Sequence, residues 1–382
     1  MQDLTLVQGG RGLLRITGGR IAGFEPETGD LRIGLCAGDG LLPGLINAHD
    51  HLQLNVLPRL KYRGSYQNVG EWIADIEPRL RTDPLFLANA AVPRAQRLLI
   101  GGLKNLLCGV TTVAHHDPLY PELQEDHGFP VRVLSRYGWS HSLALEGAAA
   151  VQRSCRDAPA DRPWIIHAAE GVDALATSEF KALEALGCLK ANTVFVHGVA
   201  FDTAQRDRLL QAGAGLVWCP GSNLHLFGRT ADVRTLAAQG RVALGSDSRI
   251  SGSADLLAEL HVAREASDLD EAALEALVTI NAARLLRLPD CGRLTRGARA
   301  DLLVLPKDLP LSQARRADVR LVMVGGVPRY ADPDLVEAFG ASADLVPVRV
   351  DGRPKWLARS LVRALDEACI GEPGLETLTE FA

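Results

Sequence analysis

Two histidines separated by a single residue are the first feature of this sequence that could do chemistry. His49 and His51 follow the apolar run 41–46. Alternate side chains of an extended strand point to the same face, so both imidazoles would project together. Two converging imidazoles can bind one metal ion, whereas Asp50 between them would face away and serve the structure. Alone, the pair is equally compatible with a polar strand end that carries two solvated histidines.

Residues of metal-ligand type also follow three later apolar runs, each at the point where the run ends. His167 follows 164–166, His197 follows 193–196, and Asp247 follows 242–246. Each has a plain structural explanation, as a hydrogen-bonded strand-end histidine or as an aspartate that caps a turn. Their recurrence in this order predicts that they gather at one rim with His49 and His51. Imidazole nitrogen and carboxylate oxygen suit Zn²⁺ or Fe²⁺, with a position left for water.

The stretches between these residues indicate how a fold could bring them to one rim. From about residue 43 the sequence alternates apolar strand-like runs with helix-like segments, which is typical of a parallel sheet covered by helices. Strands are expected at 45–48, 110–114, 131–134, 164–167, 193–196, 215–218 and 242–245, with an eighth around 137–143. Helices are expected at 84–107, 177–186, 203–211 and 253–265. We therefore expect an α/β fold, a (β/α)8 TIM-like barrel with one abbreviated unit, whose chemistry lies at the C-terminal strand ends.

Both ends of the chain differ from this middle. Short strand-like runs broken by glycines fill 3–42, and the same texture returns in 292–330. We expect 1–42 plus 292–330 to form a small β-sandwich domain, 43–291 to form the barrel, and 331–382 to form a helical tail. The alternative for the two β-rich ends is a pair of unrelated hairpin clusters.

Composition excludes several kinds of partner. The net charge of −5 and the isoelectric point near 6.1 argue against nucleic acid and anionic membranes. The seven cysteines are scattered without a Cys-x-x-Cys pair, which is typical of reduced thiols. No charged-then-apolar leader stands at the N-terminus, and no apolar run has the length of a membrane span. We expect a cytoplasmic protein that acts on a small molecule, and the sequence leaves a homodimer open.

At this point the sequence resembles the amidohydrolase superfamily over nearly the whole chain, from 41–44 through 292–303. It is most similar to the branch of amino-heterocycle deaminases and chlorohydrolases, which includes guanine deaminase and the triazine hydrolases. The matching motifs are His49-Asp50-His51, His167-Ala168-Ala169-Glu170, Val196-His197-Gly198, Cys219-Pro220-Gly221-Ser222-Asn223 and Gly245-Ser246-Asp247.

The resemblance implies a role for each polar residue of these motifs. One metal would be held by His49, His51, His167 and Asp247, with Zn²⁺ as the expected ion and Fe²⁺ as the alternative. The catalytic residues would be Glu170, His197 and Asp247. His197 would orient water or substrate, and Asp247 would accept a proton from a water whose pKa the metal lowers toward about 7. Glu170 would shuttle protons to the ring and to the leaving amine.

Glu170 and His197 could alternatively have purely structural roles. Glu170 would alternatively be a solvated residue at a helix start, favoured by the helix dipole, and His197 a residue without a direct role.

The number of metal ions can be inferred from the positions of the lysines. Binuclear relatives carry a carboxylated lysine, or a glutamate, at the end of the fourth strand, and no lysine of this sequence stands there. We therefore expect a single metal. The His-x-Glu and Pro-Cys-x-x-Cys motifs of the other zinc deaminases are absent from the sequence.

The substrate pocket is harder to predict. A long segment, 52–80, follows the first strand, and polar or aromatic residues follow later strands; such rim loops usually shape a pocket. The expected substrate-binding residues are Gln53, Trp72, His141, Asn223 and His225. Their alternative role is packing. His115 and His116 depart from the family pattern, and their role as substrate contacts or as supporting residues stays open.

The expected activity is hydrolysis of a C–N bond, as the deamination of an amino-substituted heterocycle or cyclic amidine. The alternative on the same metal is ring opening of a cyclic amide, as in imidazolonepropionase-like relatives. A third alternative is a non-catalytic binding protein that has kept the barrel.

Overall fold

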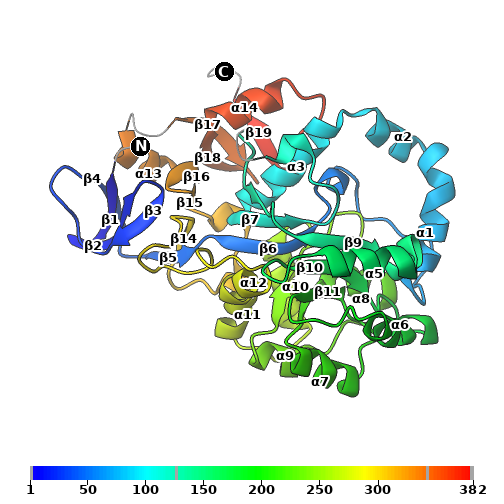
Figure 1. Cartoon of the computed structure of the whole chain (residues 1–382). Coiled ribbons are helices and arrows are strands. Elements are labelled where there is room, and N and C mark those ends of the chain that lie inside the picture. The colour runs from blue at the N-terminus through cyan, green and yellow to red at the C-terminus, as the bar shows by residue number, and fades with distance from the viewer. Residues whose placement is uncertain (1–2, 125–127, 341–343, 379–382) are drawn as a thin grey trace.

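The barrel strands carry all the strand-end residues singled out above. The computed structural model describes residues 3–124, 128–340 and 344–378. In these residues eight parallel strands follow one another around the barrel (Figure 1). They are β6 (Leu45–Asp50), β7 (Val110–His115), β8 (Arg132–Val133), β9 (Gly138–Ser142), β10 (Trp164–Ala168), β11 (Thr193–His197), β12 (Gly215–Trp218) and β13 (Val242–Leu244). Strands β6 to β8 form one sheet and β9 to β13 another.

The end of the last strand returns to the first. The amide of Asp247 donates to the carbonyl oxygen of His49 at 3.1 Å, which joins the ends of β13 and β6. The expected (β/α)8 barrel is confirmed. Every residue of β10 and β11 is buried, because helices cover the outside of the parallel sheet and side chains fill its inside. Only a short connection separates β8 from β9, which is the abbreviated unit expected from chain length.

Helices surround these strands. They are α1 (Val69–Ile76), α2 (Pro84–Ala91), α3 (Arg94–Leu107), α4 (Leu143–Glu146), α5 (Ala148–Asp157), α6 (Ala174–Ala185), α7 (Thr203–Ala212), α8 (Pro220–Phe227), α9 (Arg234–Ala238), α10 (Leu256–Glu265), α11 (Glu271–Leu277) and α12 (Ile280–Leu285). The single helix expected over 84–107 is two helices, because Pro93 supplies no backbone donor and forces Val92 into an extended conformation.

Both ends of the chain contribute strands beside the barrel (Figure 1). A four-stranded sheet contains β1 (Leu4–Gln8), β2 (Arg11–Thr17), β3 (Arg20–Gly23) and β4 (Leu31–Leu35). A seven-stranded sheet joins β5 (Asp39–Pro43) to β14 (Leu302–Pro306), β15 (Leu321–Val324), β16 (Val327–Ala331), β17 (Leu345–Val350), β18 (Arg353–Ala358) and β19 (Leu375–Thr377). Strands β5 and β14 pair antiparallel. This arrangement agrees with a β-sandwich built from both termini, while the proposed domain boundaries stay a prediction.

The expectation of a helical C-terminal tail is wrong. This segment holds α13 (Pro333–Phe339) and α14 (Arg359–Asp366), but β17, β18 and β19 continue the seven-stranded sheet. The sequence signal was an alternation of apolar residues in 345–350 followed by Asp351-Gly352, both with positive φ. An Asp-Gly pair between alternating strands is a strong hairpin signal.

The structure also bears on the expectations about cysteines and membrane spans. All seven cysteines are free thiols. Among the described residues, no helix has the length and apolar character needed to cross a membrane.

Candidate active site

Three strand ends bring the four expected metal ligands to one buried point. The Nε2 atom of His167, at the end of β10, lies 3.3 Å from His49 Nε2 and 3.4 Å from His51 Nε2, both at the end of β6. The Oδ1 atom of Asp247, just past β13, lies 3.7 Å from His49 Nε2 and 4.0 Å from His51 Nε2. Two donors at about 2.1 Å from a tetrahedral zinc ion lie about 3.4 Å apart. The spacing of these nitrogens therefore fits a metal ion.

In His51 and His167, a neighbouring group holds the second ring nitrogen and so determines where the proton lies. His167 Nδ1 donates to the carbonyl oxygen of His141 at 2.7 Å, so its Nε2 carries a lone pair. His51 Nδ1 bonds to Asp117 Oδ2 at 2.8 Å. Such contacts orient ligating imidazoles in metal proteins.

The charges around this point favour a cation. Burial disfavours a charged His51, yet Asp117 and Asp247 outweigh it and raise the pKa of His51 to about 9. The two carboxylates therefore favour positive charge beside His51, such as that of a divalent ion. We conclude that the residues present fit one divalent metal.

Asp247 is held in a single orientation. Its Oδ1 accepts from the amide of Ser248 at 2.7 Å, and its Oδ2 accepts from Ser251 Oγ at 2.8 Å. Its backbone has φ +54°, and Ala169 and His197 at two other strand ends also have positive φ. Residues held in this conformation often cluster at functional sites, where the surrounding structure enforces it.

Glu170 and His197 form a second pair beside the ligands. Glu170 Oε1 lies 3.6 Å from His197 Nε2. Burial raises the pKa of the Glu170 carboxyl well above its ordinary value, with a further contribution from Asp247. Burial lowers the pKa of His197 to about 4, and its Nδ1 donates to Asn223 Oδ1 at 2.9 Å. The pair thus combines a carboxyl whose pKa is raised by burial with an imidazole whose Nε2 carries a lone pair.

A buried polar network lies behind the strand β6. Asp50 faces away from the ligands, as strand alternation predicts, and accepts from Lys104 Nζ at 3.2 Å. Lys104, from α3, also donates to Ser246 Oγ at 3.0 Å and to the carbonyl oxygen of Asp247 at 2.8 Å. Both charged side chains are fully buried. The network therefore ties α3 to the two segments that carry His49, His51 and Asp247.

Three of the five expected substrate-binding residues lie at this cluster. Gln53 Nε2 donates to Asp117 Oδ2 at 2.8 Å. The ring of His141 lies 4.7 Å from that of His167, centroid to centroid. Asn223 is fully buried and its amide supports His197, which is a positioning contact. All three stay predictions as substrate contacts.

The other two expected residues serve different neighbours. The indole of Trp72 donates to the carbonyl oxygen of Leu60 at 3.1 Å and packs beside Leu57 and Tyr66. His225 lies on α8 near Arg59 and Lys61, whose charges add to burial in lowering its pKa to about 4. Both residues stay predictions as substrate contacts.

Sequence reasoning missed the parts played by two residues that follow β7. Asp117 holds His51, and His116 lies within the group of histidines with His49, His51 and His167. The signal was present, because both residues directly follow a predicted strand, but spacing alone did not show which side chains point inward.

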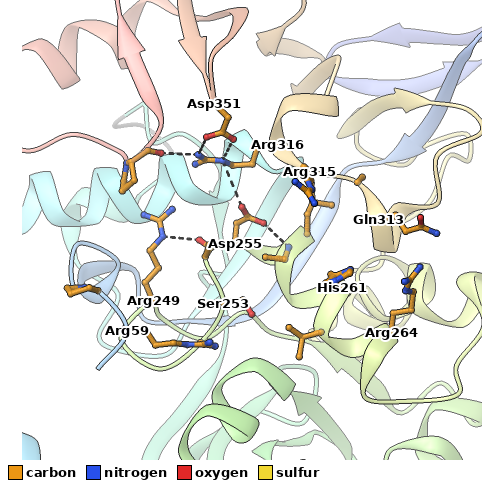
Figure 2. Close-up of a pocket in the computed structure, with 18 residues that line it drawn as sticks. Arg59, Arg249, Ser253, Asp255, His261, Arg264, Gln313, Arg315, Arg316 and Asp351 are labelled. Carbon is orange, nitrogen blue, oxygen red and sulfur yellow. Dashed lines mark hydrogen bonds and ion pairs between the residues drawn. The ribbon is translucent and has the colours of Figure 1, made fainter. Parts of the chain in front are cut away.

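A cavity of about 940 Å³ lies next to the loop that follows Asp247 (Figure 2). Its wall includes the loop Gly252–Asp255, but none of the expected site residues lines it. Arg249 and Arg316 line it and are paired with Glu372, and Arg316 also with Asp351. These arginines join the C-terminal segment to the barrel.

The sequence is similar to a known protein family and to proteins named as deaminases. The sequence profile of the amidohydrolase family matches residues 144–329. A 5-methylthioadenosine/S-adenosylhomocysteine deaminase of Haloarcula marismortui is 26% identical over 362 residues, which cover 81% of this chain and 82% of that protein. An 8-oxoguanine deaminase of Pseudomonas aeruginosa is 33% identical over 174 residues, which cover 39% of this chain and 38% of that protein.

Solved structures share the fold. An adenosine deaminase from Xanthomonas campestris with bound zinc has a TM-score of 0.68 at 20% identity, covering 86% of this chain and 93% of that one. An atrazine chlorohydrolase from Arthrobacter aurescens complexed with zinc has a TM-score of 0.69 at 17% identity, covering 87% of this chain and 96% of that one.

Proposed function

Because this chain belongs to the amidohydrolase family and is a hydrolase of C–N bonds, we propose that it deaminates an amino-substituted purine or a related heterocycle. The carrying observation is the buried point where His49, His51, His167 and Asp247 converge beside the buried carboxyl of Glu170. Relatives named as deaminases of purine compounds support the substrate class.

The metal site has four proposed ligands. His49, His51, His167 and Asp247 would hold one divalent ion, and Zn²⁺ is proposed because two solved neighbours carry it; Fe²⁺ is the alternative. When bound, this ion makes hydroxide available at neutral pH by lowering the pKa of water. We also propose a cytoplasmic location, since a reducing compartment keeps thiols such as the seven found here unpaired.

Side chains of this protein carry out the proton transfers of the reaction. Asp247 accepts the proton of the attacking water as the new C–O bond forms. Glu170 donates its proton to the ring nitrogen beside the carbon under attack. Glu170 then accepts the remaining proton of the added hydroxyl group and passes it to the amino group, which leaves as ammonia as the C–N bond breaks. The proton held by Asp247 afterwards returns Glu170 to its starting state. His197 presents its Nε2 lone pair to the attacking water, since Asn223 holds the proton on Nδ1.

Ammonia release from a panel of heterocycles tests this proposal. The zinc-loaded protein is incubated with adenosine, methylthioadenosine, guanine, 8-oxoguanine, an aminopyrimidine and an aminotriazine, and product masses are recorded. Deamination exchanges NH for O, whereas ring opening of a cyclic amide adds a whole water. Ammonia from at least one aminopurine supports the proposal. Ring opening of a cyclic amide without ammonia from any panel member would overturn it.

Glu170→Gln tests the proton transfer separately. The amide keeps the shape of the side chain but holds no transferable proton, so turnover should fall by about 10²- to 10⁴-fold. Metal content, measured by mass spectrometry of the elements, should equal that of the unchanged protein, because Glu170 is not among the proposed ligands. A turnover close to that of the unchanged protein would remove Glu170 from the mechanism.

A further inference from the structure

His116 is a buried histidine that the proposed mechanism does not use. It directly follows β7, and its amide donates to the carbonyl oxygen of Asp50 at 3.0 Å. Its side chain is 1% exposed. The ring stacks on that of His167 with centroids 4.2 Å apart, and it meets the ring of His49 edge-on at 5.1 Å. His116 therefore lies against the proposed ligands on two sides.

One nitrogen of this ring has no partner. His116 Nε2 donates to the carbonyl oxygen of Ser140 at 2.9 Å, and a carbonyl oxygen only accepts, so the proton is on Nε2. Nδ1 then carries a lone pair, and it is buried without a hydrogen-bond partner. Buried polar atoms of native proteins are nearly always paired, so an unpaired one calls for an explanation.

Two neighbours of His116 show the same arrangement. In His51 and His167, one ring nitrogen is held by a carboxylate or a carbonyl oxygen, and the other faces the proposed ion. His116 has one nitrogen on a carbonyl oxygen and the other unpaired. A ligating histidine typically donates its second ring N–H to such an acceptor.

We propose that His116 Nδ1 is a further ligand, so that four imidazoles and Asp247 hold the divalent ion. The inference rests on the proposed function, because it adds a donor to the metal site named there. A six-coordinate ion would keep one position for water, so the site would take a first-row transition ion that accepts five or six ligands.

The distances allow this ligand set. One ligand atom from each of His49, His51, His116 and His167 lies within 4.8 Å of the other three. Donors on opposite sides of an ion, each about 2.1 Å away, lie about 4.2 Å apart. The separations therefore exceed the span of one ion by no more than about 0.6 Å.

His115 provides a matched control, because it is the adjacent histidine on the opposite face. Its Nδ1 accepts from the amide of Leu52 at 3.3 Å, and its ring neighbour among the described residues is Tyr120. A substitution there removes the same chemistry without touching the four clustered rings.

The first test measures the affinity for Zn²⁺ alone, by competition with a chromophoric chelator. We compare the unchanged protein with His116→Asn, His116→Phe and His115→Asn. Phenylalanine keeps a ring to stack on His167 but has no donor atom. Both His116 variants should bind Zn²⁺ about 10- to 100-fold more weakly, and His115→Asn should bind as the unchanged protein does. Equal affinity of His116→Phe and the unchanged protein would overturn the inference and leave the proposed function standing.

The second test needs no variant, so poor folding cannot obscure it. X-ray absorption fine structure of the zinc-loaded protein counts the imidazole ligands, and the inference requires four. Three imidazoles would overturn it while supporting the metal site of the proposed function. Uptake of neither Zn²⁺ nor Fe²⁺ by the unchanged protein would overturn the metal site and this inference together.

Discussion

Two of the proposed ligand histidines, and His197 beside them, each depend on a neighbour that determines which ring nitrogen is free. His51 is held by Asp117, His167 by the carbonyl oxygen of His141, and the nearby His197 by Asn223. These neighbours come from other strands or loops, so they act only after the barrel has closed. The free nitrogens then all face the interior of the rim.

Asp117→Asn tests this dependence at the level of one residue. The amide keeps the shape of the side chain but removes the negative charge that favours a cation beside His51. We expect the affinity for Zn²⁺ to fall about 10- to 100-fold, as for other residues that support a ligand. The measurement is metal retained after dialysis against a graded chelator. Asp157→Asn, which removes an exposed carboxylate paired with Arg156, is the control. Equal retention by both variants would contradict the role of Asp117.

Sequence could predict which residues gather at the rim but not how their side chains pair. Parallel strand ends meet at one edge whatever the side chains do, so His167 and Asp247 could be placed with His49 from spacing alone. Pairing depends on rotamers and on loops distant in sequence. The hydrogen bond between the side-chain amide of Asn223 and His197 was therefore not predicted from the sequence.

At the scale of elements, the two faces of strand β6 carry side chains with different roles. One face presents His49 and His51 to the interior. The other presents Asp50 to Lys104 of α3 and to Asn105 at 2.9 Å. A buried ion pair contributes little net stability when intact, but removal of one partner leaves an uncompensated charge.

Lys104→Met tests how much the buried pair of Lys104 and Asp50 contributes to stability. The charge of Asp50 would remain buried without its cation, and the free energy of unfolding should fall by about 3–5 kcal/mol. Denaturant unfolding followed by circular dichroism measures it. Adding Asp50→Asn should recover part of the loss, because the two residues act as one unit. Lys181→Met, at an exposed position of α6, is the control, and an unfolding midpoint for Lys104→Met equal to the control's would contradict the argument.

Helices and strands could be predicted where the sequence shows a clear hydrophobic pattern. The barrel strands are buried on both faces, so their apolar runs stood out, and β9 lay within the expected 137–143. The break between α2 and α3 required attention to Pro93. The hairpin of β17 and β18 required attention to the turn at Asp351-Gly352.

At the scale of the whole molecule, the C-terminal segment supports the loop that carries Asp247. Glu372 is 2% exposed and pairs with Arg249 at 2.6 Å and with Arg316 at 2.7 Å. Arg249 lies two residues after Asp247, and its amide donates to Asn55 Oδ1 at 3.1 Å. Figure 2 shows Arg249 and Arg316 on one wall of the cavity, with Arg316 reaching Asp351. Such long-range ion pairs have no signature in sequence spacing, which is why the segment was expected to be a separate tail.

Glu372→Gln tests whether this support is real. The variant leaves two arginines near one another without the carboxylate between them, so the free energy of unfolding should fall by about 3–5 kcal/mol. The C-terminal segment should also be cleaved faster by a protease at low concentration, because its attachment to the barrel is weakened. Glu376→Gln, at an exposed position of β19 in the same segment, removes an equal charge and should change neither property. If the two variants unfold and are cleaved alike, the ion pairs of Glu372 do not hold the segment, and packing of β17 and β18 alone must do so.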